Sequence, residues 1–177
     1  RYYRDLKGGS MLGPVQKGWL LNTLRKSDAK IKFLVSCVPW SPGVKPGSKD
    51  TWDGFAAERE EIFTFIHQNK INGVLLMAAD RHRSDLRRIP RTDGYDFYEM
   101  MSSRLTNVHT HPLMENAKGS VFLMGYNKEC SFGRVTIDTT KEDPTLEYAI
   151  VNIDGEEVES YTLRLSEMTG RVSKITP

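Results

Sequence analysis

Two uninterrupted apolar segments stand out along the chain, at residues 31–38 and 73–79. An unbroken apolar run of this length is typical of a strand that is buried on both faces of a sheet. Between them, residues 55–69 carry apolar side chains at helical spacing, with glutamates on the opposite, polar side. The order strand, helix, strand predicts a βαβ unit, in which two parallel strands are joined by a right-handed crossover.

A further helix is predicted before this unit, over residues 14–25, because Pro14 suits a first helical turn. Its apolar residues fall on one stripe, which we expect to face the core: Val15, Trp19, Leu20 and Leu24. Residues 39–54 instead form a long loop that contains three prolines. Long loops inside compact domains are usually functional, so this one is of interest.

After residue 85 the pattern changes to short strand-like segments that are separated by turn signals. Five strands are predicted, at residues 97–101, 121–126, 132–137, 146–153 and 160–165. We expect an antiparallel meander that either closes the edge of the first sheet or packs on it as a second sheet. Residues 166–177 are polar and are predicted to be a poorly ordered tail, which leaves residues 1–165 as the domain.

Composition adds limits to this α/β prediction. The 177 residues correspond to one domain or part of a larger one, and the first residue is Arg1, so we expect the chain to begin inside a longer polypeptide. The net charge of +2 gives no argument for binding to nucleic acid or membranes, and no apolar stretch reaches the ~20 residues of a membrane span. Cys37 lies in an apolar run and is expected to be buried.

The chemistry gathers where the second apolar strand stops, at Asp80-Arg81-His82-Arg83-Ser84. In open α/β sheets, ligands bind just beyond the carboxyl ends of the strands. In extended backbone, Asp80 and His82 would project to the same side and could bind one Lewis-acidic metal ion. The two arginines suit an anionic substrate. The alternative is a polar loop that caps the strand, with Asp80 paired to Arg81 or Arg83.

Four segments within residues 1–85 resemble the carboxy-terminal half of alkaline phosphatase D-like enzymes, a branch of the calcineurin-like metallophosphoesterases. The segments are Arg1-Tyr2-Tyr3-Arg4; Ser10-Met11-Leu12-Gly13 with Gln16 and Trp19-Leu20; Asp50-Thr51-Trp52-Asp53-Gly54-Phe55 with Glu58-Arg59; and Ala79-Asp80-Arg81-His82-Arg83-Ser84. The chain departs from the family at Ala79, where glycine is usual. It also lacks the upstream aspartate, histidine or cysteine, and asparagine metal ligands of the family.

The resemblance implies the carboxy-terminal portion of a metallophosphoesterase sandwich that hydrolyses phosphate esters, as an alkaline phosphatase or phosphodiesterase. A metal-bound hydroxide would attack phosphorus. The implied cofactors are divalent or mixed metal ions, such as iron with calcium, with Asp80 and His82 among the ligands. His82 would alternatively protonate the leaving oxygen, and with Arg83 it would stabilise the phosphoryl charge. Arg81 and Trp52 would contact the substrate, whereas Asp53 suits an N-cap of the next helix.

The implied partners are a phosphate ester and the amino-terminal half of the same polypeptide, and the implied location is secreted or periplasmic. Because most ligands lie upstream, the rival hypothesis is a non-catalytic binding domain that keeps the fold. The arginines at residues 81–91 predict a basic patch, but few aromatic residues interleave them, so nucleic acid is not expected as a specific partner. His109 and His111 could form a metal-binding pair, although exposed loop histidines are the favoured interpretation, and His67 is expected at the surface.

Overall fold

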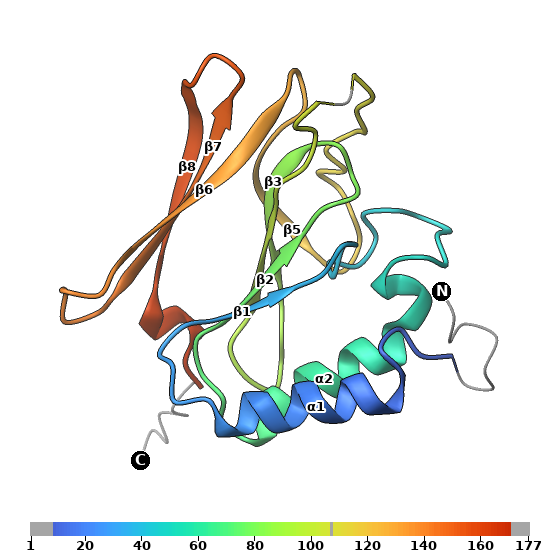
Figure 1. Ribbon diagram of the computed structural model, residues 1–177, viewed down its shortest axis with the longest axis vertical. Helices are drawn as coiled ribbons and strands as arrows, with labels where there is room; N and C mark the ends of the chain where they lie inside the picture. Colours follow the sequence, from blue (N-terminus) through green and yellow to red (C-terminus); the bar gives the residue numbers. More distant parts are fainter. Residues whose placement is uncertain (1–8, 107, 171–177) are drawn as a thin grey trace.

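Two β-sheets and two main helices make up the fold of the computed structural model, which describes residues 9–106 and 108–170 (Figure 1). The α-helices are α1 (Gly13–Lys26) and α2 (Ala56–Gln68), and two short 3-10 helices are η2 (Trp52–Phe55) and η3 (Leu165–Met168). The strands are β1 (Lys32–Val35), β2 (Val74–Ala78), β3 (Ser84–Ile89), β4 (Phe97–Met101), β5 (Val121–Tyr126), β6 (Ser131–Asp138), β7 (Thr145–Asn152) and β8 (Glu157–Arg164).

The predicted βαβ unit is confirmed. Strands β1 and β2 are neighbours and run parallel, with Leu34 opposite Leu76, and α2 connects them. Val74, Leu75 and Leu76 are fully buried, as an uninterrupted apolar strand should be. Strand β1 is shorter than expected and lies at the edge of its sheet, whose order is β1-β2-β4-β3-β5.

The predicted antiparallel meander is divided between two sheets. Strands β4 and β5 have the predicted bounds and belong to the first sheet, where β4 runs parallel to β2 and antiparallel to β3. Strands β6, β7 and β8 form a separate antiparallel sheet. The sequence left open whether these strands join the first sheet or pack on it as a second sheet. Both occur, and the two sheets give the expected sandwich.

The second sheet packs on the side of the first that faces away from the helices (Figure 1). Tyr148 of β7 is buried there, and its hydroxyl donates to the carbonyl oxygen of Met101 at 2.6 Å. The hydroxyls of Ser84 and Ser131 also share a hydrogen bond of 2.9 Å between the sheets. These contacts join the far sheet to the end of β4 and the start of β3, which is where the candidate site lies.

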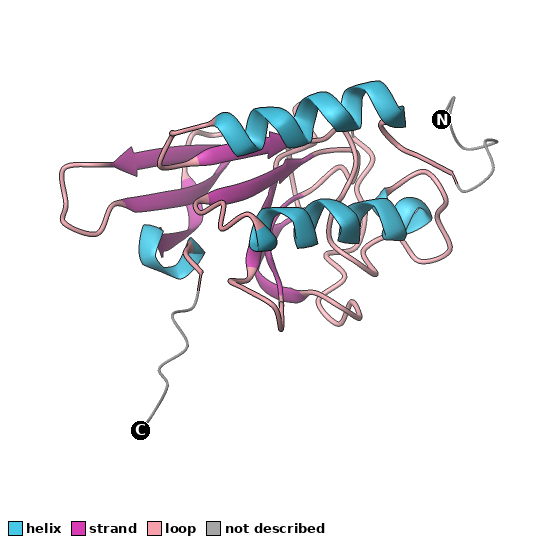
Figure 2. Ribbon diagram, turned by 90° about the horizontal axis from the view of Figure 1, so that it is seen from below, coloured by secondary structure: helices cyan, strands magenta, loops and turns pink. Residues whose placement is uncertain are grey.

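The helices lie side by side on the other face of the first sheet (Figure 2). Helix α2 contributes Ile62, Phe63 and Ile66 to the core. Helix α1 buries less than its stripe predicts: Leu24 is buried, but Trp19 is 63% exposed. The expectation for this stripe was therefore wrong at its amino-terminal end. Another expectation was wrong for Cys37, which lies beyond the end of β1 and is exposed.

The predicted tail begins later than residue 166. Helix η3 covers Leu165–Met168, and Met168 is fully buried, so the first residues of that segment belong to the core. Residues 171–177 and the Arg1-Tyr2-Tyr3-Arg4 segment lie outside the described residues. Within residues 9–106 and 108–170, no helix has both the length and the apolar character that crossing a membrane requires.

Candidate functional site

The candidate site is a tight turn between β2 and β3. Strand β2 ends at Ala78 and β3 begins at Ser84, so the chain reverses direction within the five residues between them. Asp80 and His82 have φ angles of 74° and 47°, in the left-handed region, so the expectation of extended backbone at these residues was wrong. Aspartate and histidine visit this region more readily than most residues, but it remains uncommon and is concentrated at functional sites.

Asp80 is exposed and forms an ion pair with Lys45, with 3.4 Å between Oδ2 and Nζ. Lys45 belongs to the long loop before α2 and also contacts Asp50 at 3.1 Å. Hydrogen bonds from Ser48 and Lys45 lower the pKa of Asp50 to about 2. The alternative in which Asp80 pairs with Arg81 or Arg83 is thus replaced by a pairing between the turn and the long loop.

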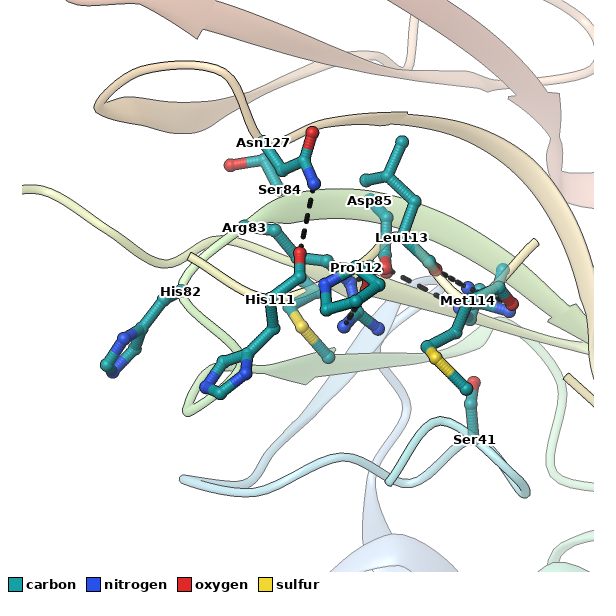
Figure 3. A network of polar contacts seen from close by, with 12 residues as sticks. Ser41, His82, Arg83, Ser84, Asp85, His111, Pro112, Leu113, Met114 and Asn127 are labelled. Carbon is teal, nitrogen blue, oxygen red and sulfur yellow. Dashed lines mark hydrogen bonds and ion pairs between the residues drawn. The ribbon is translucent and has the colours of Figure 1, made fainter. Parts of the chain in front are cut away.

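Three imidazoles come together beside this turn. The ring centre of His82 lies 5.3 Å from that of His111 and 6.3 Å from that of His109, and the latter two are 6.1 Å apart. Figure 3 shows the rings of His82 and His111 projecting in the same direction, away from the buried residues behind them. Burial lowers the pKa of His111, and the neighbouring charge of Arg81 lowers it further. The sequence favours exposed loop residues for His109 and His111, and their two-residue spacing is its only signal of this grouping.

Arg83 is not an accessible phosphate clamp. Its side chain is fully buried and its Nε donates to Asp85 at 2.6 Å. Its Nη1 donates to the carbonyl oxygen of Pro112 at 2.8 Å. The catalytic role that the resemblance implies for Arg83 needs an exposed guanidinium. In the structure, the guanidinium is buried and binds the loop that carries His111.

Arg87 lies on the same face of β3 as Asp85, because side chains two apart on a strand share a face, and both are fully buried. Its Nη2 donates to the carbonyl oxygens of Leu113 and of Met114, the latter at 2.9 Å, and its Nε lies 3.5 Å from Asp85. On the adjacent strand, Glu99 accepts from the amides of Trp40 at 2.6 Å and Ser41 at 3.0 Å, and its complete burial raises its pKa. Loops, and not a helix, cover this part of the sheet, and buried charges fix their backbones.

Trp52 also differs from its expected role. It is 1% exposed, stacks on Trp40 with 4.1 Å between ring centres, and donates its indole N–H to Ser36 Oγ at 3.0 Å. The structure places it in the core and not on an exposed cleft wall. Asp53 is likewise not the predicted N-cap, because its carboxylate accepts from the Gly43 amide and from Arg59, each at 2.9 Å.

The next two arginines after Arg87 are paired with carboxylates. Arg88 pairs with Asp96 at 2.5 Å, and Arg91 pairs with Asp93 at 3.1 Å and with Glu60. The basic patch predicted over residues 81–91 is therefore not a solvated surface. Arg81 is 7% exposed, and burial lowers the pKa of its guanidinium.

The donors at this site are too few for the metal centre that the resemblance implies. Asp80 and His82 are suitable ligand types, but Asp80 faces an ammonium group. No group of three or more His, Cys, Asp or Glu side chains that could hold a metal ion occurs in the part of the chain that the structure describes. The described residues alone do not fit a complete two-metal site.

Comparison with known proteins agrees with the resemblance. In an 81-residue alignment that covers 42% of this chain, it is 33% identical to alkaline phosphatase D of Bacillus subtilis. A solved structure titled "Structure of PhoD" shares the fold, with a TM-score of 0.68 and 18% identity over 88% of this chain. The chain spans 14% of the first protein and 32% of the second. Because the family model of PhoD-like phosphatases matches residues 3–148, the chain belongs to the PhoD-like phosphatase family.

Proposed function

We propose that this chain forms part of an enzyme that hydrolyses phosphate esters, as a phosphatase or phosphodiesterase. The observation that carries the proposal is the position of Asp80 and His82: in a PhoD-like chain, they stand directly beyond the carboxyl end of β2. Ligands of open α/β folds bind at this edge. Both residues adopt uncommon backbone conformations, which fits a functional turn better than a simple loop cap.

Asp80 and His82 would each supply one metal ligand in this proposal. Metal ions would supply Lewis acidity toward a phosphoryl oxygen when bound. The remaining ligands would come from a segment outside these residues, which agrees with the small share of each relative that the chain spans. His82 could alternatively hold the proton that goes to the leaving oxygen. Arg81 is the candidate for contact with phosphoryl oxygens, because it lies between Asp80 and His82 in the turn and its Nε has no hydrogen-bond partner among the described residues.

Two substitutions test this proposal, in a protein that carries these 177 residues after the upstream segment found in the relatives. Asp80→Asn keeps the size of the side chain and removes its charge, and His82→Ala removes a ligand or proton donor. Each should lower kcat/KM for p-nitrophenyl phosphate by about 100- to 10,000-fold. Melting temperatures should stay near that of the wild type, because Asp80 is exposed and His82 half-buried.

Arg88→Ala is the matched control. Arg88 lies on β3 toward the opposite end of the sheet, where it pairs with Asp96. This variant should change turnover only modestly. Full activity in both site variants at saturating substrate and metal would refute the proposal.

The rival function is a non-catalytic binding domain, and the incomplete donor set favours it. The same proteins distinguish the two functions. A binding domain would show no turnover in any form, including the wild type with its upstream segment and added metal ions.

A further inference from the structure

The loop at residues 109–114 is held against the candidate site by hydrogen bonds from buried arginines and from its neighbours. Two fully buried arginines donate to the carbonyl oxygens of three consecutive residues, Pro112, Leu113 and Met114. Toward the other end of the loop, Asn127 donates to the carbonyl oxygen of His111 at 3.0 Å. The Thr110 hydroxyl donates to the carbonyl oxygens of His82 and of Asn127, at 3.2 and 3.0 Å.

Burying two guanidinium groups is costly unless each is paired and hydrogen-bonded. Arg83 and Arg87 share one adjacent carboxylate, Asp85, so part of their hydrogen bonding comes from loop carbonyls. A loop fixed in this way loses little conformational freedom when a ligand binds, which is how binding groups are preorganised. The residues whose position is fixed are His109 and His111.

These imidazoles share a small region with His82. Ring centres are 5.3 to 6.3 Å apart, and Nδ1 of His82 is buried without a hydrogen-bond partner among the described residues. The three rings do not qualify as a metal-binding group. An oxyanion has a different requirement: several N–H donors around it at hydrogen-bond distance, with cationic charge nearby. Imidazoles supply N–H donors, and the Arg81 guanidinium, next to His82 in the turn, supplies a cation whose Nε has no hydrogen-bond partner among the described residues.

We propose that His109 and His111, which lie beside His82, contact the phosphoryl oxygens of the substrate directly, so that the loop at residues 109–114 completes the phosphate subsite. This inference rests on the proposed function and adds two substrate-binding residues to it. Neither residue lies in the segment that resembles the family motifs, which ends near residue 85. The contact is direct and does not require a metal ion between the rings and the phosphate.

The test is a titration with inorganic phosphate, at constant pH and with a chelator present, followed by NMR of the histidine ring nitrogens; the protein is the one that carries these 177 residues after the upstream segment found in the relatives. The ring signals of His109 and His111 should shift with one common Kd. His67 is the internal control: it lies near the carboxyl end of α2, which precedes the start of β2, and its signal should not move. His111→Ala and His109→Ala should each weaken binding by about tenfold or more. His111→Gln, which keeps an N–H donor, should recover part of the loss.

Several results would overturn the inference. Phosphate could shift His82 alone, the alanine variants could bind phosphate as tightly as the wild type, or no ring signal could respond. In each case the inference fails, while the activity of the Asp80→Asn and His82→Ala proteins still decides the proposed function separately. Binding that appears only after a divalent metal ion is added would also contradict a direct contact.

Discussion

His67 shows how far the setting of a single side chain can differ from its place in a helical pattern. Its imidazole stacks on Phe97 at 4.9 Å between ring centres and meets the Tyr95 ring at 5.0 Å. The side chain is 4% exposed, and Nδ1 lies 3.3 Å from Asp93. The side chain expected at the surface is therefore largely buried. Burial lowers its pKa, and the charge of Asp93 opposes that effect in part.

A lowered histidine pKa makes the folded chain less stable in acid. Below the ordinary histidine pKa the unfolded chain takes up a proton more readily than the folded chain, so stability falls as pH falls. We expect the free energy of unfolding to decrease between pH 7.5 and 5.5, by at most about 1.4 kcal/mol per pH unit for one group. His67→Gln should flatten this slope, as measured by urea unfolding at several pH values. His111 contributes to both proteins, so equal slopes would mean that His67 has no part in the effect.

The site residues illustrate what single positions reveal in the sequence. The abrupt end of the apolar run located Asp80 and His82 at the turn after β2, because the run itself forms the strand. The sequence did not reveal that the side chains of Arg83 and Trp52 are buried and do not face a substrate. Whether a guanidinium or an indole is exposed depends on loops distant in sequence: Pro112 accepts from Arg83, and Trp40 covers Trp52.

At the scale of elements, strands with continuous apolar sequence were predicted well and β3 was not. Strand β2 is apolar on both faces, and β4 is apolar apart from Glu99, which a short window of sequence can detect. Strand β3 alternates Leu86 with Asp85 and Arg87, all of them fully buried. Its charged face is covered by loops that bring their own polar backbone groups. A charged strand in the core cannot be recognised without those partners.

Packing between strands β6 and β7 depends on a glycine. A methyl group at Gly133 would lie 2.3 Å from the ring of Tyr148, and that ring is buried and fixed by its hydrogen bond to Met101. We expect Gly133→Ala to destabilise the chain by about 1–3 kcal/mol through overpacking. Thermal and urea unfolding would measure the change.

Gly18 provides the opposite case within α1. A methyl group there has no atom within 4 Å to meet, and alanine suits a helix interior better than glycine. Gly18→Ala should therefore stabilise the chain by up to about 1 kcal/mol. Similar stability changes for the two variants would contradict the close contact at Gly133.

At the scale of the whole molecule, the chain corresponds to 32% of the solved relative's length. Its edge strand β1 and helix α1 leave apolar side chains exposed, at Val15, Trp19 and Val35. Exposed apolar groups on an unpaired edge favour association with other protein surfaces. The donors at the turn after β2 are likewise insufficient for a metal centre among the described residues.

The 177-residue chain by itself should therefore lack phosphatase activity. We expect no turnover of p-nitrophenyl phosphate above background when iron, calcium, manganese or zinc ions are added, because most ligands are absent. The protein that also carries the upstream segment should show turnover under the same conditions. Robust metal-dependent activity of the shorter protein would mean that the ligands have been assigned to the wrong part of the enzyme.

The position of β4 between β2 and β3 has a consequence for biosynthesis. A ribosome delivers β3 before either of its neighbours, β4 and β5, so the nascent strand has no partner in the sheet when it first appears. An apolar strand in that state would invite aggregation, whereas charged side chains discourage it. We expect Asp85 and Arg87 to keep the unpaired strand β3 hydrated until its neighbours are synthesised. When β4 and the covering loops are in place, the same charges form the buried ion pair and hydrogen bonds that hold those loops.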